Sequence, residues 1–175
     1  SDMPANFVTQ LLENVGPETR QTINHLLQYP DDSAGSIMTT EYVCLKAGMS
    51  VAEAFDHIRA TGVDKETIYT CYVTDASRHL IGVTTVKELL LHNYDDKIED
   101  FMETNIIFVN THDDKEIAAN YFDKYNFLAL PVVDMEERLV GIITFDDAID
   151  VLQEENTEDI HKMNAMVRTT EKPYL

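Results

Sequence analysis

An internal repeat is the feature of this chain that most restricts its fold. Residues 72–85 (YVTDASRHLIGVTT) match residues 131–144 (PVVDMEERLVGIIT) at a constant offset of 59. Upstream, residues 37–39 resemble residues 101–103 at an offset of 64, so the first copy carries about five extra residues near positions 61–68. A repeat of this length indicates one structural unit that occurs twice.

Each copy predicts the same order of elements: a short apolar strand, a helix, two strands around a polar turn, and a second helix. In the first copy these are residues 42–45, 51–60, 68–73, 80–84 and 86–92; in the second they are residues 106–109, 115–124, 129–133, 139–143 and about 146–155. Gly82 and Gly141 lie inside strand patterns, where glycine marks a bulge or the close approach of another backbone or a ligand. Neither copy is large enough for a core of its own, so the order β-α-β-β-α, twice, predicts a paired α+β domain.

The chain in front of the repeats predicts two helices within residues 3–29. Pro17 starts the second helix and Pro30 ends it. Two helices of this length bury little apolar surface alone, so we expect them to pack on something else. The polar and small residues 31–36 predict a loop or linker.

The composition excludes several classes of partner. Thirteen Lys and Arg stand against 32 Asp and Glu, a net charge of −19. So acidic a chain is not expected to bind nucleic acid or anionic lipid, and it favours cations or basic surfaces. No apolar run approaches the ~18–20 residues needed to cross a bilayer. Cys44 and Cys71 are expected to be reduced thiols in apolar strands.

An acidic run begins the last helix of the second copy. Residues 146–159 hold seven acids and no Lys or Arg. Four of the acids are spaced to share one face of a helix, where like charges repel by ~0.2–0.5 kcal/mol per pair: Asp147, Asp150, Glu154 and Glu158. This face is either a solvated surface or a divalent-cation site. Mg²⁺, which takes oxygen ligands and keeps several waters, suits the second reading.

The repeated motif resembles the cystathionine-β-synthase (CBS) domain, and the two copies together resemble a tandem CBS pair over residues 37 to about 155. Three longer strings narrow the resemblance to the cytosolic region of MgtE-type magnesium channels and transporters. They are LLQYPDDSAGSIMTTEYV at residues 26–43, GVDKETIYTCYVTD at residues 62–75 and TFDDAIDVLQEENTEDIHKM at residues 144–163.

The resemblance implies a division of the chain and a setting for it. Residues 1–30 would be the last helices of a truncated helical N-domain, residues 31–36 a linker, 37–100 and 101–157 the two CBS domains, and 158–175 the start of a segment toward a membrane domain. The chain would be a cytoplasmic part of a multi-pass cell-membrane protein and a homodimer through its CBS domains. The apolar surface expected for the dimer is Leu89, Leu90, Ile149 and Leu152.

The resemblance also implies regulatory Mg²⁺ sites. Acids at the matching positions lie at or near such sites in the family: Asp147, Asp150, Glu155, Glu158 and Asp159, with Asp114 and Glu116 as weaker candidates. Asn126 stands where relatives commonly have an acid, which is expected to weaken one site.

A second motif, Thr-x-x-acid, occurs at Thr85–Glu88 and again at Thr144–Asp147. Either threonine predicts an N-cap for the helix that follows it. In CBS pairs the same motif often contacts a nucleotide, which would fit a helix N-terminus. In the first copy we expect Thr85 and Lys87 at phosphate, Glu88 at ribose and Phe127 stacked on a base, with ATP as the candidate ligand.

Two functions follow as alternatives. The first is a Mg²⁺ sensor that closes a magnesium channel or transporter when cytosolic Mg²⁺ is high. The second is a CBS pair that senses adenine nucleotides for an enzyme or a transporter. The sequence shows no zinc-ligand spacing, no nucleophile elbow and no phosphate-binding glycine loop, so we do not expect an enzyme.

Overall fold

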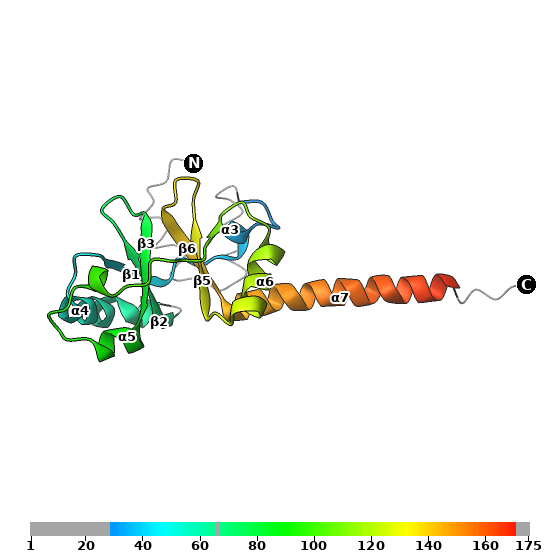
Figure 1. The fold of residues 1–175 in the computed structure, drawn as a ribbon. Helices are drawn as coiled ribbons and strands as arrows, with labels where there is room; N and C mark the ends of the chain where they lie inside the picture. Colours follow the sequence, from blue (N-terminus) through cyan, green and yellow to red (C-terminus); the bar gives the residue numbers. More distant parts are fainter. Residues whose placement is uncertain (1–28, 66, 171–175) are drawn as a thin grey trace, which may run out of the picture.

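The computed structural model of the protein describes residues 29–65 and 67–170. The helices expected before residue 29 lie outside these ranges. Two units of similar architecture stand side by side, and one long helix, α7, projects from the second unit (Figure 1). The tandem α+β pair predicted from the repeat is therefore confirmed.

The first unit is a three-stranded sheet with two helices. Its strands lie in the order β1-β2-β3, with β1 parallel and β3 antiparallel to β2: β1 is Tyr42–Lys46, β2 Thr67–Thr74 and β3 Leu80–Thr85. Helix α4 (Val51–Thr61) joins β1 to β2, and α5 (Val86–Leu91) follows β3. The extra residues of the first copy form the 3-10 helix η1 (Gly62–Asp64) and lengthen β2.

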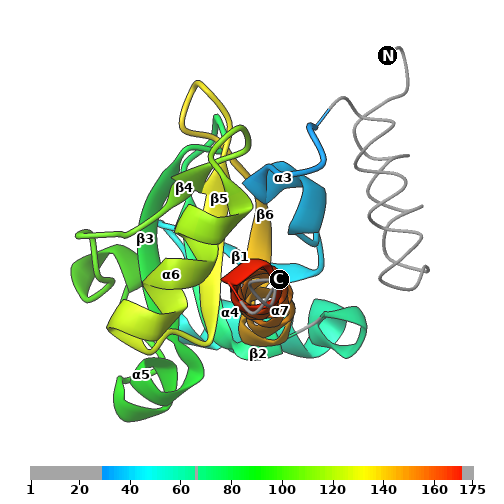
Figure 2. The ribbon, with the colours of Figure 1, turned by 90° about the vertical axis from the view of Figure 1, so that its right-hand side faces the viewer.

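The second unit repeats this plan in the order β4-β5-β6, again with one parallel and one antiparallel pair. Its strands are β4 (Val109–Asn110), β5 (Ala129–Val133) and β6 (Leu139–Thr144); its helices are α6 (Lys115–Tyr125) and α7 (Phe145–Thr170). Figure 2 looks along α7 and shows α6 on one side of it and α3 (Ala34–Ile37) on the other.

Side-chain caps fix where the helices begin. Ser50 and Glu53 form a capping box at α4, where the Ser50 hydroxyl accepts a hydrogen bond from the Glu53 backbone N–H at 3.2 Å. The predicted threonine caps are confirmed: the Thr85 Oγ1 accepts from Glu88 N at 3.1 Å, and the Thr144 Oγ1 accepts from Asp147 N at 3.3 Å. These caps define the first residues of α5 and α7, and therefore the positions of the acidic residues along both helices.

The short segment that opens each copy packs on the sheet of the other copy. Thr39 pairs with Ile142 of β6, and Glu103 pairs with Val83 of β3. Accordingly α3 joins the core of the second unit, while the 3-10 helix η2 (Ile98–Asp100) contributes Ile98 to the core of the first. A third core cluster lies between the two sheets and contains Tyr72, Ala129, Leu139 and Ile142.

Residues 31–36 were expected to be a loop or linker, but three of them belong to helix α3, which begins at Ala34. Two further sequence-based element boundaries are wrong. The first strand of the second copy was expected at residues 106–109, whereas β4 begins at Val109. Glu103 is hydrogen-bonded to β3 of the first unit. Residues 104–108 therefore connect the two units, and the chain pairs with β5 only from Val109 onward. The last helix was expected to end near residue 155 but continues to Thr170, because residues 156–170 contain neither Gly nor Pro.

Candidate functional site

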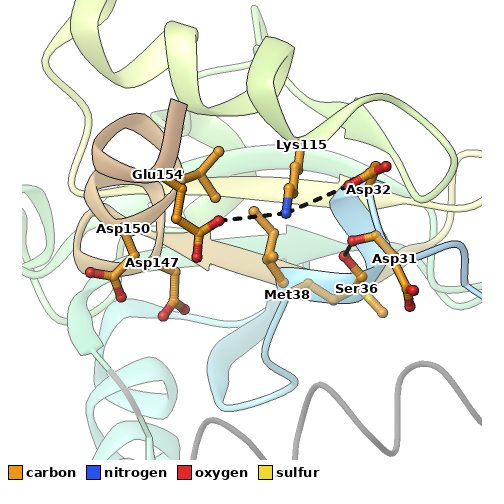
Figure 3. A pocket seen from close by; sticks show the side chains of 10 residues that line it. Asp31, Asp32, Ser36, Met38, Lys115, Asp147, Asp150 and Glu154 are labelled. Atoms are coloured by element: carbon orange, nitrogen blue, oxygen red, sulfur yellow. Dashed lines mark hydrogen bonds and ion pairs between the residues drawn. The ribbon is translucent and has the colours of Figure 1, made fainter. Parts of the chain in front are cut away.

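An acidic cavity of about 270 Å³ lies where the first turns of α6 and α7 face the segment that carries α3 (Figure 3). Five carboxylates and one ammonium group line it, together with Ser36 and three apolar side chains: the charged residues are Asp31, Asp32, Lys115, Asp147, Asp150 and Glu154. The acids come from two segments more than 100 residues apart in sequence. The fold therefore concentrates negative charge that neither segment holds alone.

Helix α7 supplies three of the acids because of its spacing and its cap. Asp147, Asp150 and Glu154 stand three and four residues apart and so share one helical face. The Thr144 hydroxyl donates to the Asp147 Oδ2 at 3.1 Å, which orients this half-buried carboxylate at the start of the helix. Asp150, one turn later, is exposed to solvent.

Lys115, the first residue of α6, places its ammonium group among these acids. Its Nζ lies 3.8 Å from the Asp32 Oδ1 and 3.8 Å from the Glu154 Oε2. Figure 3 shows Lys115 between these two carboxylates, with Asp147 and Asp150 beside each other on the α7 side. The Lys115 side chain is only 20% exposed, whereas those of Asp32 and Glu154 are 88% and 71% exposed.

The structure brings together some of the candidate metal ligands and separates others. Asp147 and Asp150 line the cavity, but Glu155, half-buried on α7, is not among its described lining residues. Asp114 caps α6 instead, where its Oδ1 accepts from the Glu116 backbone N–H at 2.8 Å. Neither Asp114 nor Glu116 lines the cavity. Glu158 and Asp159 belong to α7, but their side chains lie outside the described residues.

The donor chemistry of the cavity suits a hydrated magnesium ion. Within residues 29–65 and 67–170, no group of three or more His, Cys, Asp or Glu side chains stands close enough together to form a ready chelate. Mg²⁺ does not need one, because it usually keeps several waters and binds through one or two carboxylates. Asp147 and Asp150 offer such a pair of oxygen ligands, opposite the acids that precede α3.

Three of the six charged residues that line the cavity were not predicted from the sequence. Asp31 and Asp32 were assigned to a linker, although two adjacent acids after Pro30 were a visible signal. Lys115 gave no signal, since its pairing with Asp32 and Glu154 depends on the approach of α3 and α7 to α6.

A second cavity, of about 340 Å³, lies between the two sheets and is mainly apolar. Thr85 and Phe127, both expected at a nucleotide, line it together, but Lys87 and Glu88 are exposed and are not among its described lining residues. Glu103 is the one charged side chain among those that line it. We call this cavity the inter-sheet cleft.

Tyr72 also lines the inter-sheet cleft and carries a polar group in an apolar setting. Its side chain is 1% exposed, and its hydroxyl has no hydrogen-bond partner among the described residues. Burial raises the pKa of this phenol far above its ordinary value.

None of the helices that the structure describes is long and apolar enough to cross a membrane. The CBS domain family matches residues 34–94 and 98–154. The magnesium transporter MgtE of Thermus thermophilus is 41% identical over 163 residues, which is 93% of this chain and 36% of that protein.

Two solved structures are similar at 39% sequence identity. One is the soluble part of a magnesium transporter, with a TM-score of 0.73 over 82% of this chain and 56% of that chain. The other is the cytosolic domain of the Mg²⁺ channel MgtE in complex with ATP, with a TM-score of 0.71 over 86% of this chain and 60% of that chain. The chain spans about a third of the length of the full MgtE relative. The chain thus belongs to the CBS domain family, as a tandem pair that is similar to MgtE magnesium transporters over most of its length.

Proposed function

We propose that this chain is the cytosolic Mg²⁺-sensing part of a multi-pass magnesium transporter or channel, and that it closes the transport pathway when intracellular Mg²⁺ is high. The observation that supports this most is the acidic cavity, because its carboxylates come from α7 and from the segment before α3. A cation there would stabilise one arrangement of these two elements. In this proposal the chain has no enzymatic activity, and its partner is a membrane domain of the same protein.

The mechanism follows from charge. At an effective dielectric constant of about 20, two unit charges ~4 Å apart repel by about 4 kcal/mol. Without a cation, such repulsion among the carboxylates opposes closure of the cavity. A Mg²⁺ ion that bridges carboxylates, directly or through its waters, replaces their mutual repulsion with attraction to the shared cation. It therefore favours the closed arrangement. A few kcal/mol is enough to move a two-state equilibrium.

The test is a millimolar Mg²⁺ titration followed by limited proteolysis and small-angle scattering, with NaCl matched for ionic strength. Mg²⁺ is expected to protect and compact the parent protein. Asp147→Asn combined with Asp150→Asn removes two charges from the cavity and should blunt both effects. Asp95→Asn combined with Asp123→Asn removes two exposed charges elsewhere and should not. An equal response to matched NaCl would reduce the effect to screening and overturn the proposal.

The proposal includes a homodimer formed through the CBS units. Leu90 and Leu91 of α5 are 68% and 71% exposed, an apolar surface that a second copy would cover. Leu89, which the sequence grouped with this surface, is fully buried inside its own unit and is not available. Sedimentation should show a dimer at tens of micromolar protein; a monomer with and without Mg²⁺ would contradict this part.

The inter-sheet cleft favours a second candidate function, the sensing of adenine nucleotides. Thr85 and Phe127 both line this cavity of about 340 Å³, and the similar MgtE cytosolic domain was solved in complex with ATP. Its apolar walls suit the flat ring of a base. The two functions are compatible, because the acidic cavity and the inter-sheet cleft have no described lining residue in common.

A further inference from the structure

We propose that Lys115 is a tethered counterion of the acidic cavity, which competes with the divalent cation and so sets the Mg²⁺ concentration at which the cavity fills. This inference rests on the proposed Mg²⁺-sensing function and assigns a regulatory residue to it. Lys115 is the one basic residue among the described residues that line the cavity.

The contacts of Lys115 join the two sources of acids. Its Nζ lies 3.8 Å from Asp32, which precedes α3, and 3.8 Å from Glu154 of α7. Its backbone N–H donates to the Asp32 carbonyl oxygen at 2.8 Å, which fixes the start of α6 against the same segment. The ammonium group therefore spans the gap that a bridging cation would span.

The position of Lys115 is unfavourable for a positive charge when only its own helix and its burial are considered. It is the first residue of α6, and a cation at a helix N-terminus opposes the helix dipole. Its side chain is also mostly covered, which costs a charged group part of its hydration. The surrounding carboxylates offset both effects, so the placement of this charge follows from the acidic cavity and not from helix stability.

A divalent cation that enters the cavity meets this fixed positive charge. The ammonium repels the cation and neutralises part of the carboxylate charge that would attract it. It also holds Glu154 and Asp32 in ion pairs, so these acids must exchange one cation for another. Removal of the Lys115 charge should therefore strengthen Mg²⁺ binding, the opposite of what removal of a ligand does.

The experiment is calorimetric titration of Mg²⁺ at constant ionic strength into the parent and three variants. Lys115→Met keeps the length of the stem and removes the charge; Lys115→Arg keeps the charge. Lys124→Met is the matched control, because Lys124 lies on the same helix over the Tyr125 ring and outside the cavity. We expect Lys115→Met to raise the association constant about fivefold or more, a change that one unit charge ~8 Å from a divalent ion produces even at the dielectric constant of water. Lys115→Arg should resemble the parent, and Lys124→Met should change it less than twofold.

A second readout does not depend on Mg²⁺ affinity. In EDTA, Lys115→Met should melt at a lower temperature than Lys124→Met, because the carboxylates have lost their counterion. Saturating Mg²⁺ should raise the melting temperature of Lys115→Met more than that of the parent.

The outcomes separate the two proposals. If the parent binds Mg²⁺ but Lys115→Met binds it no more tightly than Lys124→Met, the counterion role is overturned and the Mg²⁺ sensor stands. If the parent shows no binding beyond that of matched NaCl, the sensor itself fails and the counterion role fails with it.

Discussion

The Met38 side chain fills the space beside Gly141, with its Sδ 2.6 Å and its Cγ 2.9 Å from the position that a Cβ at Gly141 would take. The second copy mirrors this contact, since Met102 lies in the same way against Gly82 of the first unit. Each methionine opens one copy and packs on the sheet of the other. The two units are therefore coupled through reciprocal contacts that only glycine permits.

A methyl group at Gly141 should destabilise the protein. Besides Met38, the new Cβ would meet the Thr39 carbonyl oxygen at 3.0 Å, and that backbone is fixed by its pairing with Ile142. Overpacking of this kind typically costs about 1–3 kcal/mol. Gly141→Ala should lower the urea midpoint accordingly, whereas Gly48→Ala, with nothing within 4 Å of its Cβ, should not. Equal midpoints for the two variants would show that the Met38 contact does not restrict position 141.

These glycines show how far the sequence predicts this structure. Gly82 and Gly141 interrupt strand patterns at equivalent places, and both expected consequences occur: the strand register shifts next to each glycine, and another segment approaches closely. The sequence could not say which segment approaches. Met38 and Met102 were visible as a repeated pair, but their exchange between units depends on how the sheets stack.

The acidic cavity was predictable only in part. The spacing of Asp147 and Asp150 places them on one face of α7 in sequence and in structure alike. Asp31, Asp32 and Lys115 join them through the approach of three elements that no local pattern encodes. The same limit explains the nucleotide motif, where Thr85 of one unit and Phe127 of the other line one cleft while Lys87 and Glu88 are exposed.

Removal of the Tyr72 hydroxyl should stabilise the protein. This group is buried without a hydrogen-bond partner among the described residues, and an unsatisfied buried polar group costs about 1–3 kcal/mol. Tyr72→Phe keeps the ring and its edge-on contact with Tyr42. We expect a free energy of unfolding higher by about 1 kcal/mol, measured by urea denaturation. A loss of stability would mean that the hydroxyl binds an ordered water or another partner.

The turn between β5 and β6 should make stability depend on acid pH. The Asp134 Oδ1 accepts from the backbone N–H groups of Glu136 and Arg138, and its Oδ2 accepts from the Arg138 Nε at 2.8 Å. Burial acts to raise the pKa of Asp134, but these bonds outweigh it and hold the pKa below its ordinary value. Because the folded pKa is depressed, the stabilisation is complete above the unfolded pKa of about 3.9 and disappears as the pH falls through the folded pKa.

The variant Asp134→Asn tests the expected direction of this pH dependence of stability. At pH 7 the variant should unfold at a lower urea concentration than the parent, because the amide carries no charge for the Arg138 guanidinium. The difference should shrink below about pH 4 and vanish once the parent carboxyl is protonated. Asp123→Asn, an exposed substitution on α6, should show no such pH dependence. A difference between Asp134→Asn and the parent that stays constant down to about pH 2 would point to altered turn geometry instead of lost charge.

The inter-sheet cleft should bind the base of an adenine nucleotide, with Glu88 at the ribose and Lys87 at the phosphates, outside the cleft. Phe127 lines the cleft, and stacking of a base on an aromatic ring contributes about 1–3 kcal/mol. Phe127→Leu should therefore weaken calorimetric binding of adenosine and of ATP alike, by roughly tenfold. Lys87→Ala combined with Glu88→Ala should abolish the calorimetric signal of ATP binding. The control is Lys97→Ala combined with Glu99→Ala, which also removes one positive and one negative exposed side chain and leaves the net charge unchanged. If ATP binds the Lys87 and Glu88 variant as it binds the parent, the phosphates are held elsewhere; if adenosine and ATP leave the parent unsaturated at millimolar concentration, the cleft is not a nucleotide site.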